Sequence, residues 1–211
     1  MAAVPSAPAP YRFTREEYYR MWESGFFSDK RVELLDGEII TMPPQNPPHA
    51  GTTNDFATIV IRSLGPNFTV RTQAPIVLND WSEPEPDIAI CRFDPNKYRH
   101  EHPKASDIFL LIEVADSSLA YDRRRKTEAY ATSGIPEYWI INLVDNRIEV
   151  FSDPDPVAQR YRQEQLAFRG DTLTLPGGVS LAVADILQQG SPDGTVDSGS
   201  SPALTRELLH F

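Results

Sequence analysis

Acidic side chains stand in two apolar segments of the sequence where they could share one cation. Asp87 opens the run 87–91, and Glu113 lies near the end of the run 108–114. Both runs are typical of buried strands, and a carboxylate in such a strand is costly unless a partner compensates its charge. If the two strands are neighbours, both acids can surround one divalent cation. Hard oxygen ligands of this kind suit Mg²⁺ or Mn²⁺.

A lysine follows these acids on the next predicted helix. Lys126 lies one turn after Asp122, and Tyr130 is four residues further on the same helix face. Metal-assisted phosphodiester hydrolysis needs a cation that polarises the phosphate and a group that orients or deprotonates the attacking water. Lys126 could supply that group. The pattern therefore predicts a catalytic set of Asp87, Glu113 and Lys126.

Each candidate also has a structural interpretation. Asp87 follows a proline and could be a turn or cap residue, whereas Glu113 inside an apolar run has no solvated face. The basic run 123–126 is either a solvated helix face or a phosphate-binding patch. Glu33 could point outward from a hairpin, and His49 could simply begin a helix.

The elements that would position these residues follow from apolar periodicity and turn signals. Thr14 can cap a helix over 15–22, and Asp36-Gly37 predicts a hairpin over 31–40. A second helix is expected from about His49 to Leu64, where Gly65-Pro66 stops it. Asp122 is expected to cap a third helix that Gly134 ends, and a short helix is expected over 184–187. Strands are predicted over 68–71, 75–78, 87–91, 108–114, 137–141 and 147–151, with further strands to about 183. This order favours a mixed α/β sheet flanked by helices.

The composition predicts one globular domain. With 211 residues, 40% of them hydrophobic, the chain can bury a core over 11–188. We expect a flexible N-terminal arm over 1–10 and a largely disordered tail over 189–211. A single cysteine, Cys91, excludes an intrachain disulfide and a cysteine zinc cage. No signal peptide and no apolar stretch of membrane-spanning length are apparent, which favours a cytoplasmic location.

The net charge limits how a nucleic acid could bind. Thirty acidic residues against 20 basic ones give a formal charge of −10. This argues against a protein coated in DNA-binding surface, because phosphate neutralisation dominates such affinity. A nuclease with a local basic patch and a metal ion remains compatible with the charge.

An ordered set of motifs extends the pattern around the candidate site. It consists of Arg31-Val32-Glu33-Leu34-Leu35-Asp36-Gly37-Glu38, His49 at a helix start, Pro86-Asp87-Ile88, Ile112-Glu113-Val114-Ala115-Asp116-Ser117-Ser118, Tyr121-Asp122 with Lys126 and Tyr130, and Gly134-Ile135-Pro136-Glu137-Tyr138-Trp139. Together these motifs resemble the Uma-two family of restriction-endonuclease-like proteins, which belongs to the PD-(D/E)XK nuclease superfamily. The resemblance covers roughly residues 11–188.

The resemblance implies a restriction-endonuclease-like fold and assigns roles to four residues. Asp87 corresponds to the first acid of the motif, Glu113 to the second, Glu33 to an additional N-terminal acid and Lys126 to the catalytic lysine. The superfamily pattern places lysine two residues after the second acid, and that position is Ala115 here. The lysine has moved to the following helix, as is usual in the family, and its long side chain can still reach the site.

Two functions from different classes follow from these observations. The first is a Mg²⁺- or Mn²⁺-dependent DNA endonuclease in which Glu33, Asp87 and Glu113 hold the metal and Lys126 positions or activates water. Arg123 to Arg125 would then guide the phosphate backbone, and a homodimer is compatible because double-strand cutters of this fold often act as symmetric pairs. The alternative is a catalytically degenerate protein on the same fold that binds nucleic acid or a protein partner. The acidic charge and Ala115 motivate that alternative.

Overall fold

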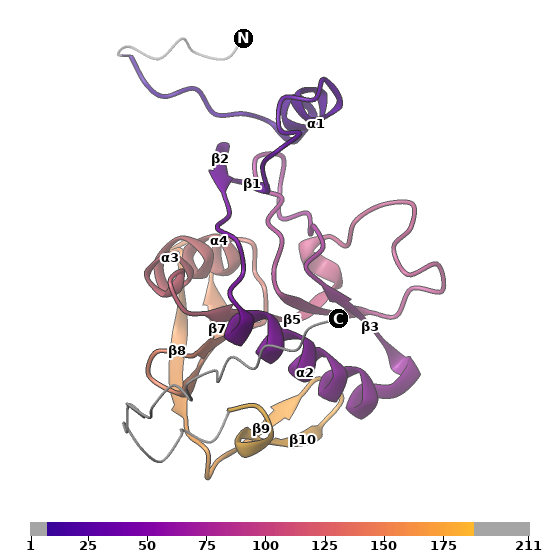
Figure 1. The fold of residues 1–211 in the computed structure, drawn as a ribbon, viewed down its shortest axis with the longest axis vertical. Helices are drawn as coiled ribbons and strands as arrows, with labels where there is room; N and C mark the ends of the chain where they lie inside the picture. The colour runs from indigo at the N-terminus through magenta and orange to yellow at the C-terminus, as the bar shows by residue number, and fades with distance from the viewer. Residues whose placement is uncertain (1–7, 188–211) are drawn as a thin grey trace, which may run out of the picture.

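The computed structural model describes residues 8–187, and Figure 1 shows their arrangement. The expected tail over 189–211 and residues 1–7 of the expected arm lie outside the described residues. The first half contains α1 (Arg15–Glu23), β1 (Val32–Leu35), β2 (Glu38–Thr41), α2 (Pro47–Leu64), η1 (Gly65–Asn67), β3 (Phe68–Thr72), β4 (Ile88–Arg92) and η2 (Ala105–Asp107). The second half contains β5 (Ile108–Ala115), α3 (Leu119–Tyr121), η3 (Asp122–Lys126), α4 (Thr127–Thr132), β6 (Glu137–Asn142), β7 (Arg147–Asp155), β8 (Arg160–Ala167), β9 (Thr172–Leu175), β10 (Val179–Ala182) and η4 (Val183–Asp185).

A six-stranded mixed sheet forms the centre of the molecule, in the order β3-β4-β5-β6-β7-β8. Neighbouring strands are antiparallel except β5 and β6, which run parallel. The helical segment from α3 to α4 makes the crossover between the two parallel strands, as a parallel pair requires. The predicted α/β class with a mixed sheet and flanking helices is confirmed.

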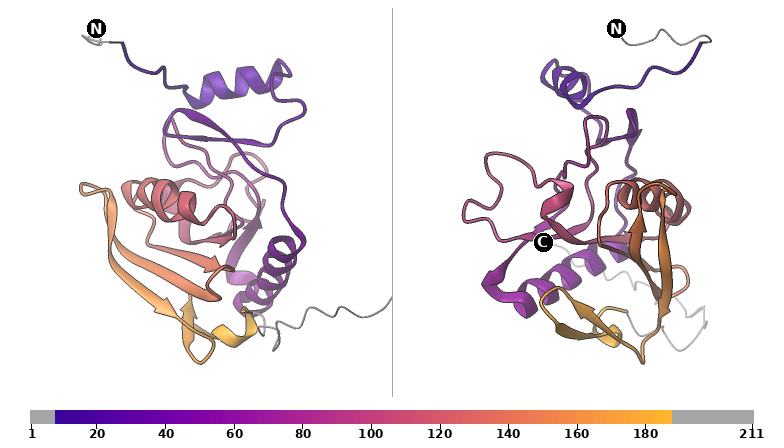
Figure 2. Two further views of the ribbon diagram at one scale, coloured as in Figure 1. Left: turned by 60° about the vertical axis from the view of Figure 1, so that its left-hand side comes forward. Right: turned by 180° about the vertical axis from the view of Figure 1, so that it is seen from behind.

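Alternating side chains of the central strands build two cores, one on each face of the sheet. Ile112 and Trp139 pack with Phe56 and Val60 of α2 on one face. Leu111 and Tyr138 pack with residues of α4 on the other face. Figure 1 shows α2 on one side of the sheet, and Figure 2 shows the segment from α3 to α4 on the other. The period-2 alternation of a strand therefore decides which helix each side chain meets.

The N-terminal elements form as the sequence predicts. Thr14 caps α1 through a capping box with Glu17. Asp36 and Gly37, with φ values of 52° and 74°, make the tight turn between β1 and β2. A Cβ atom at Gly37 would lie 2.5 Å from the Cβ of Arg12, so only glycine fits this position.

Three expected elements differ in the structure. Residues 75–78 do not join the sheet, because their backbone groups bond to loops: the Val77 N–H donates to the Pro103 carbonyl, and the Val77 carbonyl accepts from the Ala105 N–H. Asp122 does not cap a helix, since the chain is already helical from Leu119 and Asp122 begins the π-helical segment η3. The expected helix over 184–187 is a short 3₁₀ turn over Val183–Asp185. Within the described residues, no helix combines the length and the apolarity that crossing a membrane requires.

Candidate metal and catalytic site

Two adjacent strands bring Asp87 and Glu113 together. The antiparallel register places Ile88 opposite Ile112, so Asp87 lies opposite Glu113 at the same end of the pair. The backbone N–H of Asp87 donates to Glu113 Oε2 at 3.2 Å, and the backbone N–H of Val114 donates to Asp87 Oδ2 at 2.9 Å. The expected pairing of the two acids is present in the structure.

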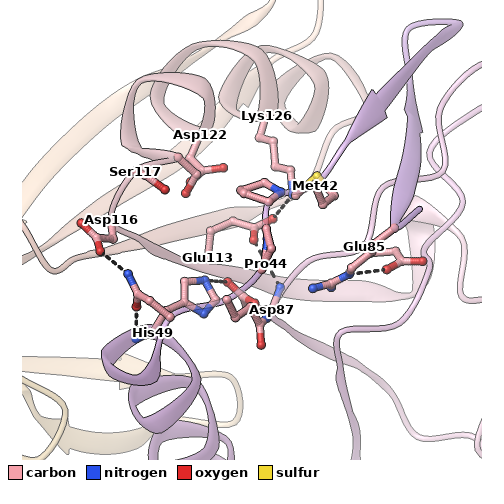
Figure 3. A pocket seen from close by; sticks show the side chains of 15 residues that line it. Met42, Pro44, His49, Glu85, Asp87, Glu113, Asp116, Ser117, Asp122 and Lys126 are labelled. Carbon is pink, nitrogen blue, oxygen red and sulfur yellow. Dashed lines mark hydrogen bonds and ion pairs between the residues drawn. The ribbon is translucent and has the colours of Figure 1, made fainter. Parts of the chain in front are cut away.

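Glu113 points to the face of the sheet that the helix after β5 covers. Lys126 Nζ donates to Glu113 Oε1 at 2.8 Å, and Tyr130 OH donates to the same oxygen at 2.9 Å. Lys126 ends the π-helical segment η3, and Tyr130 follows one turn later in α4. Figure 3 shows the lysine side chain reaching from the helix to Glu113. The predicted helix face shared by Lys126 and Tyr130 is therefore confirmed.

Glu33 reaches the same lysine from a separate hairpin. Its Oε2 lies 3.4 Å from Lys126 Nζ and accepts the backbone N–H of Glu85 at 3.0 Å. Tyr121 OH donates to Oε1 at 3.2 Å. Glu33 has 0% exposure, so the alternative of an outward hairpin residue is wrong. The loop before β4 causes this burial, because it pairs with β1 through a backbone bond from Glu83 N–H to the Leu34 carbonyl.

The start of α2 adds an imidazole to the site. His49 Nε2 lies 3.2 Å from Asp87 Oδ2. Asn46 caps α2 by accepting the His49 backbone N–H at 3.0 Å, and its amide donates to Asp116 at 2.6 Å. Sequence reasoning placed His49 at a helix start but gave it no partner. The Asn-Pro-Pro signal at residues 46–48 would have located the cap.

Opposing effects set the pKa of Lys126. Its burial alone lowers the pKa of the ammonium group, but the carboxylates of Glu113, Glu33 and Asp122 outweigh burial and hold that pKa well above its ordinary value. Lys126 is 1% exposed. The ion pairs therefore favour the protonated form of the side chain, which donates hydrogen bonds.

The acids around Lys126 respond differently to burial. Burial raises the pKa of Glu113 to about 8, against the lowering effect of Lys126. Burial also raises the pKa of Asp122 to about 6. The pKa of Asp87 is lowered despite its burial, because His49, the Val114 N–H and Gln73 all stabilise the carboxylate. The site thus combines Asp87, whose ionised form is favoured, with Glu113 and Asp122, whose protons a bound cation would displace.

A small pocket of about 60 Å³ opens over these residues. Its walls carry five acids and two permanent cations, namely Glu85, Asp87, Glu113, Asp116 and Asp122 against Arg31 and Lys126. Figure 3 shows Asp122 and Asp116 on the same side of the pocket as Ser117. Carboxylate oxygens and the excess negative charge fit a hard divalent cation. Asp87 and Glu113 are the donors that could hold it.

Glu33 does not complete a preformed three-acid site. Among residues 8–187, no group of three carboxylate, imidazole or thiol side chains is arranged to hold a metal. The Lys126 ammonium stands between Glu33 and Glu113 and forms an ion pair with each. The structure therefore gathers all four predicted site residues, but it places Glu33 against the lysine.

The basic run before Lys126 is engaged with acids. Arg123 Nε donates to Glu149 Oε2 at 2.8 Å, and Arg125 lies 3.0 Å from Glu38. Glu149 is buried and also accepts from Asn142 at 2.8 Å. Arg123 and Arg125 thus tie the helix to β7 and β2. These contacts support neither an open phosphate-binding patch nor a fully solvated face for these two arginines.

Residues 15–184 match the model of the Uma2 family, described as "Putative restriction endonuclease". None of the curated proteins matches the chain. Among solved structures, the chain is similar to "a putative nuclease belonging to DUF820 from Anabaena variabilis", with a TM-score of 0.63 and 13% sequence identity. The match covers 82% of this chain and 97% of that one, and it confirms the predicted fold.

Proposed function

The chain belongs to the Uma2 family of restriction-endonuclease-like proteins, and from this premise we propose that it is a divalent-metal-dependent endonuclease that hydrolyses phosphodiester bonds in DNA. Asp87 and Glu113 hold the cation, and Lys126 acts beside it. Mg²⁺ is the physiological ion of this proposal, with Mn²⁺ as its substitute in vitro.

The contacts of Glu113 are the observation that carries this proposal. One oxygen of this carboxylate accepts from Lys126 and Tyr130, and the other accepts from the backbone of Asp87. The two acids and the lysine come from β5, the residue before β4 and the following helix, far apart in sequence. Glu113 thus lies within 3.2 Å of the Lys126 ammonium and of the Asp87 backbone N–H, which supports a site where a cation and a hydrogen-bond donor act on the same phosphate.

The residues of the chain divide the work of hydrolysis. A bound Mg²⁺ supplies Lewis acidity, polarising the phosphate and lowering the pKa of water. Asp87 and Glu113 provide the negative charge that binds the cation. The ion pairs with Glu113 and Glu33 favour the protonated form of Lys126, so we assign it to orienting water or a phosphate oxygen by donating a hydrogen bond. Tyr130 and Tyr121 hold the acids on either side of the lysine in place.

Glu33 and the oligomeric state extend the proposal. The contacts of Glu33 support a role in positioning Lys126, and its assignment as a metal ligand stays a prediction. A homodimer stays a prediction, because it would supply two symmetric sites if the substrate were a duplex.

A cleavage assay tests the proposal with a matched pair of variants. Wild-type protein, Glu113→Gln and Glu164→Gln are incubated with supercoiled plasmid in Mg²⁺, Mn²⁺ or EDTA. Glu164 is exposed on β8, so its variant removes the same charge away from the site. We expect wild type and Glu164→Gln to nick the plasmid with metal only, and Glu113→Gln to lose about 100-fold or more in rate. Cleavage by Glu113→Gln at the wild-type rate would reject the site.

A second function is favoured by the ion pairs themselves. Lys126 is already neutralised by two buried acids, an arrangement that stabilises a fold without any metal. A catalytically inactive protein that binds nucleic acid or a protein partner would keep this network. Such a protein would fail to cleave under every metal condition of the assay while remaining folded.

A further inference from the structure

A second, larger pocket lies between α1 and the long loop that joins β4 to η2. The pocket has a volume of about 370 Å³, within the range of ligand sites. Arg15 and Tyr19 line it from α1, and Arg99, His102 and Lys104 line it from the loop. Figure 1 shows this loop projecting from the side of the molecule.

The charge of this pocket is opposite to that of the whole chain. Its walls carry three permanent cations, Arg15, Arg99 and Lys104, and one acid, Glu101. The chain as a whole has 20 basic and 30 acidic residues. Within residues 8–187, Arg99 makes no ion pair, and Lys104 pairs only with the exposed Glu101 at 3.3 Å. Both cations are therefore available to an anionic ligand.

Buried groups behind the pocket hold its walls in place. Glu83 is 2% exposed and accepts hydrogen bonds from Arg15 and Tyr19. His102 Nε2 lies 4.0 Å from the same carboxylate, and its Nδ1 lies 3.3 Å from Arg71. Arg71 also stacks over the ring of Tyr98, with its guanidinium carbon 5.9 Å from the ring centroid. These contacts fix α1 and the loop relative to each other, so the pocket is preformed.

A third depression shares lining residues with the basic pocket and with the candidate active-site pocket. Glu85 lines both the active-site pocket and this depression. Tyr19 and His102 line both this depression and the basic pocket. Trp22 lies in the wall of the depression and exposes 62% of its surface. The linings of the three depressions therefore overlap in sequence from the active-site pocket to Arg99 and Lys104, and the middle depression carries Trp22 beside the acids Glu83 and Glu85.

From this geometry we propose that a single-stranded segment of nucleic acid binds along these depressions, with its phosphates at Arg99 and Lys104 and a base stacked on Trp22. This inference rests on the proposed function, because the strand would continue from the candidate active site. Grooves for single strands combine cations that follow the backbone with exposed aromatic side chains on which bases stack. The bases of a duplex are stacked inside the double helix, so they cannot stack on Trp22. An acidic peptide would use the cations but not the tryptophan.

Binding is measured separately from cleavage to test the assignment. A fluorescent single-stranded oligonucleotide of mixed sequence is titrated with the full chain in EDTA, where metal-dependent cleavage cannot occur. The test variant is Arg99→Ala/Lys104→Ala. The matched control is Arg62→Ala/Arg160→Ala, which removes the same charge at two exposed residues that line none of the three depressions.

We expect the control to bind like wild type and the test variant to bind about fivefold or more weakly at 0.1 M salt. The slope of log K against log salt should also fall by about 1.4 for the two lost phosphate contacts, at about 0.7 for each. Equal binding by test and control variants, no binding by wild type, or tighter binding of a duplex of the same sequence would each overturn the proposal.

Trp22 gives a second readout at the same surface. Stacking of a base should quench its fluorescence, and Trp22→Ala should weaken oligonucleotide binding about fivefold or more. Trp81→Ala removes another exposed tryptophan outside the three depressions and serves as the control. Loss of cleavage in Glu113→Gln with unchanged oligonucleotide binding would support both proposals. Cleavage of a single-stranded substrate at the wild-type rate and KM by Arg99→Ala/Lys104→Ala would overturn this surface and leave the nuclease intact.

Discussion

The ammonium group of Lys126 lies 2.8 Å from Glu113 Oε1, and both side chains are almost completely buried. A buried pair of this kind owes its stability to the presence of both partners, because removal of one leaves an uncompensated charge in a medium of low polarity. The pair therefore has consequences for stability, for metal binding and for catalysis that can be separated experimentally.

The first prediction is that this pair is strongly coupled in folding. Lys126→Met should lower the free energy of unfolding by about 3–5 kcal/mol, because it leaves Glu113 and Glu33 without their cation. The double variant Lys126→Met/Glu113→Gln should be less destabilised than the sum of the single variants. Urea unfolding of the four proteins at pH 9, above the pKa of about 8 that burial gives Glu113, measures this coupling. The exposed pair of Lys104 and Glu101 is the control, with expected coupling below about 1 kcal/mol. Additive single variants at Lys126 and Glu113 would contradict the prediction.

The second prediction concerns the pH dependence of metal binding. Burial raises the pKa of Glu113 to about 8 and that of Asp122 to about 6. Below these values the carboxyl groups hold protons that a cation must displace, so affinity for Mn²⁺ should rise between pH 6 and pH 8. Calorimetric titration in two buffers with different protonation enthalpies should show proton release at pH 7. Affinity that is independent of pH, with no proton release, would show that neither acid takes part.

The third prediction assigns Arg123 to the fold and not to the substrate. Arg123 forms two hydrogen bonds with Glu149, which is 2% exposed. Arg123→Ala should lower the free energy of unfolding by about 1–3 kcal/mol, because it takes away the main partner of a buried carboxylate. The KM for DNA should stay unchanged. Arg124 is exposed beside it, and Arg124→Ala provides the control for stability. A raised KM in Arg123→Ala with unchanged stability would restore the phosphate-guiding role.

Much of the fold is readable from the sequence because its signals are local. The Asp36-Gly37 turn requires positive φ at both residues, which few other pairs adopt easily. The apolar runs around Ile88 and Ile112 are strands because both of their faces are covered. The apolar pattern of residues 75–78 predicts a strand, and Ile76 is buried as such a pattern suggests. Its backbone bonds go to loops that only the tertiary structure brings near.

The candidate site is less readable because it depends on contacts between distant segments. Lys126 and Tyr130 share a helix face, so their common target could be predicted. The burial of Glu33 depends on the pairing of β1 with the loop at Glu83. Local sequence patterns do not predict this contact, because the two segments are distant in the chain. Asp122 resembles a helix cap in sequence, but the helix begins three residues earlier, which buries Asp122 in the pocket. Tyr121 belongs to the sequence motif, but its hydrogen bond to Glu33 could not be predicted because the two residues lie far apart in the chain.

The last prediction separates the two functions of the Lys126 site, metal binding and catalysis. The ammonium group repels a divalent cation held by Glu113 and Asp87, and it also competes for Glu113 and Glu33 through its ion pairs. Lys126→Met should therefore bind Mn²⁺ about tenfold or more tightly than wild type, and added Mn²⁺ should raise its melting temperature by more. Cleavage should nevertheless fall by about 100-fold, because the donor that orients the attacking water is missing.

Lys30→Met removes an exposed lysine outside the site and should leave both properties unchanged. Weaker Mn²⁺ binding by Lys126→Met would mean that the lysine holds the acids in their binding geometry more than it repels the cation. Tighter binding together with unchanged cleavage would remove Lys126 from the chemistry and assign it to the fold alone.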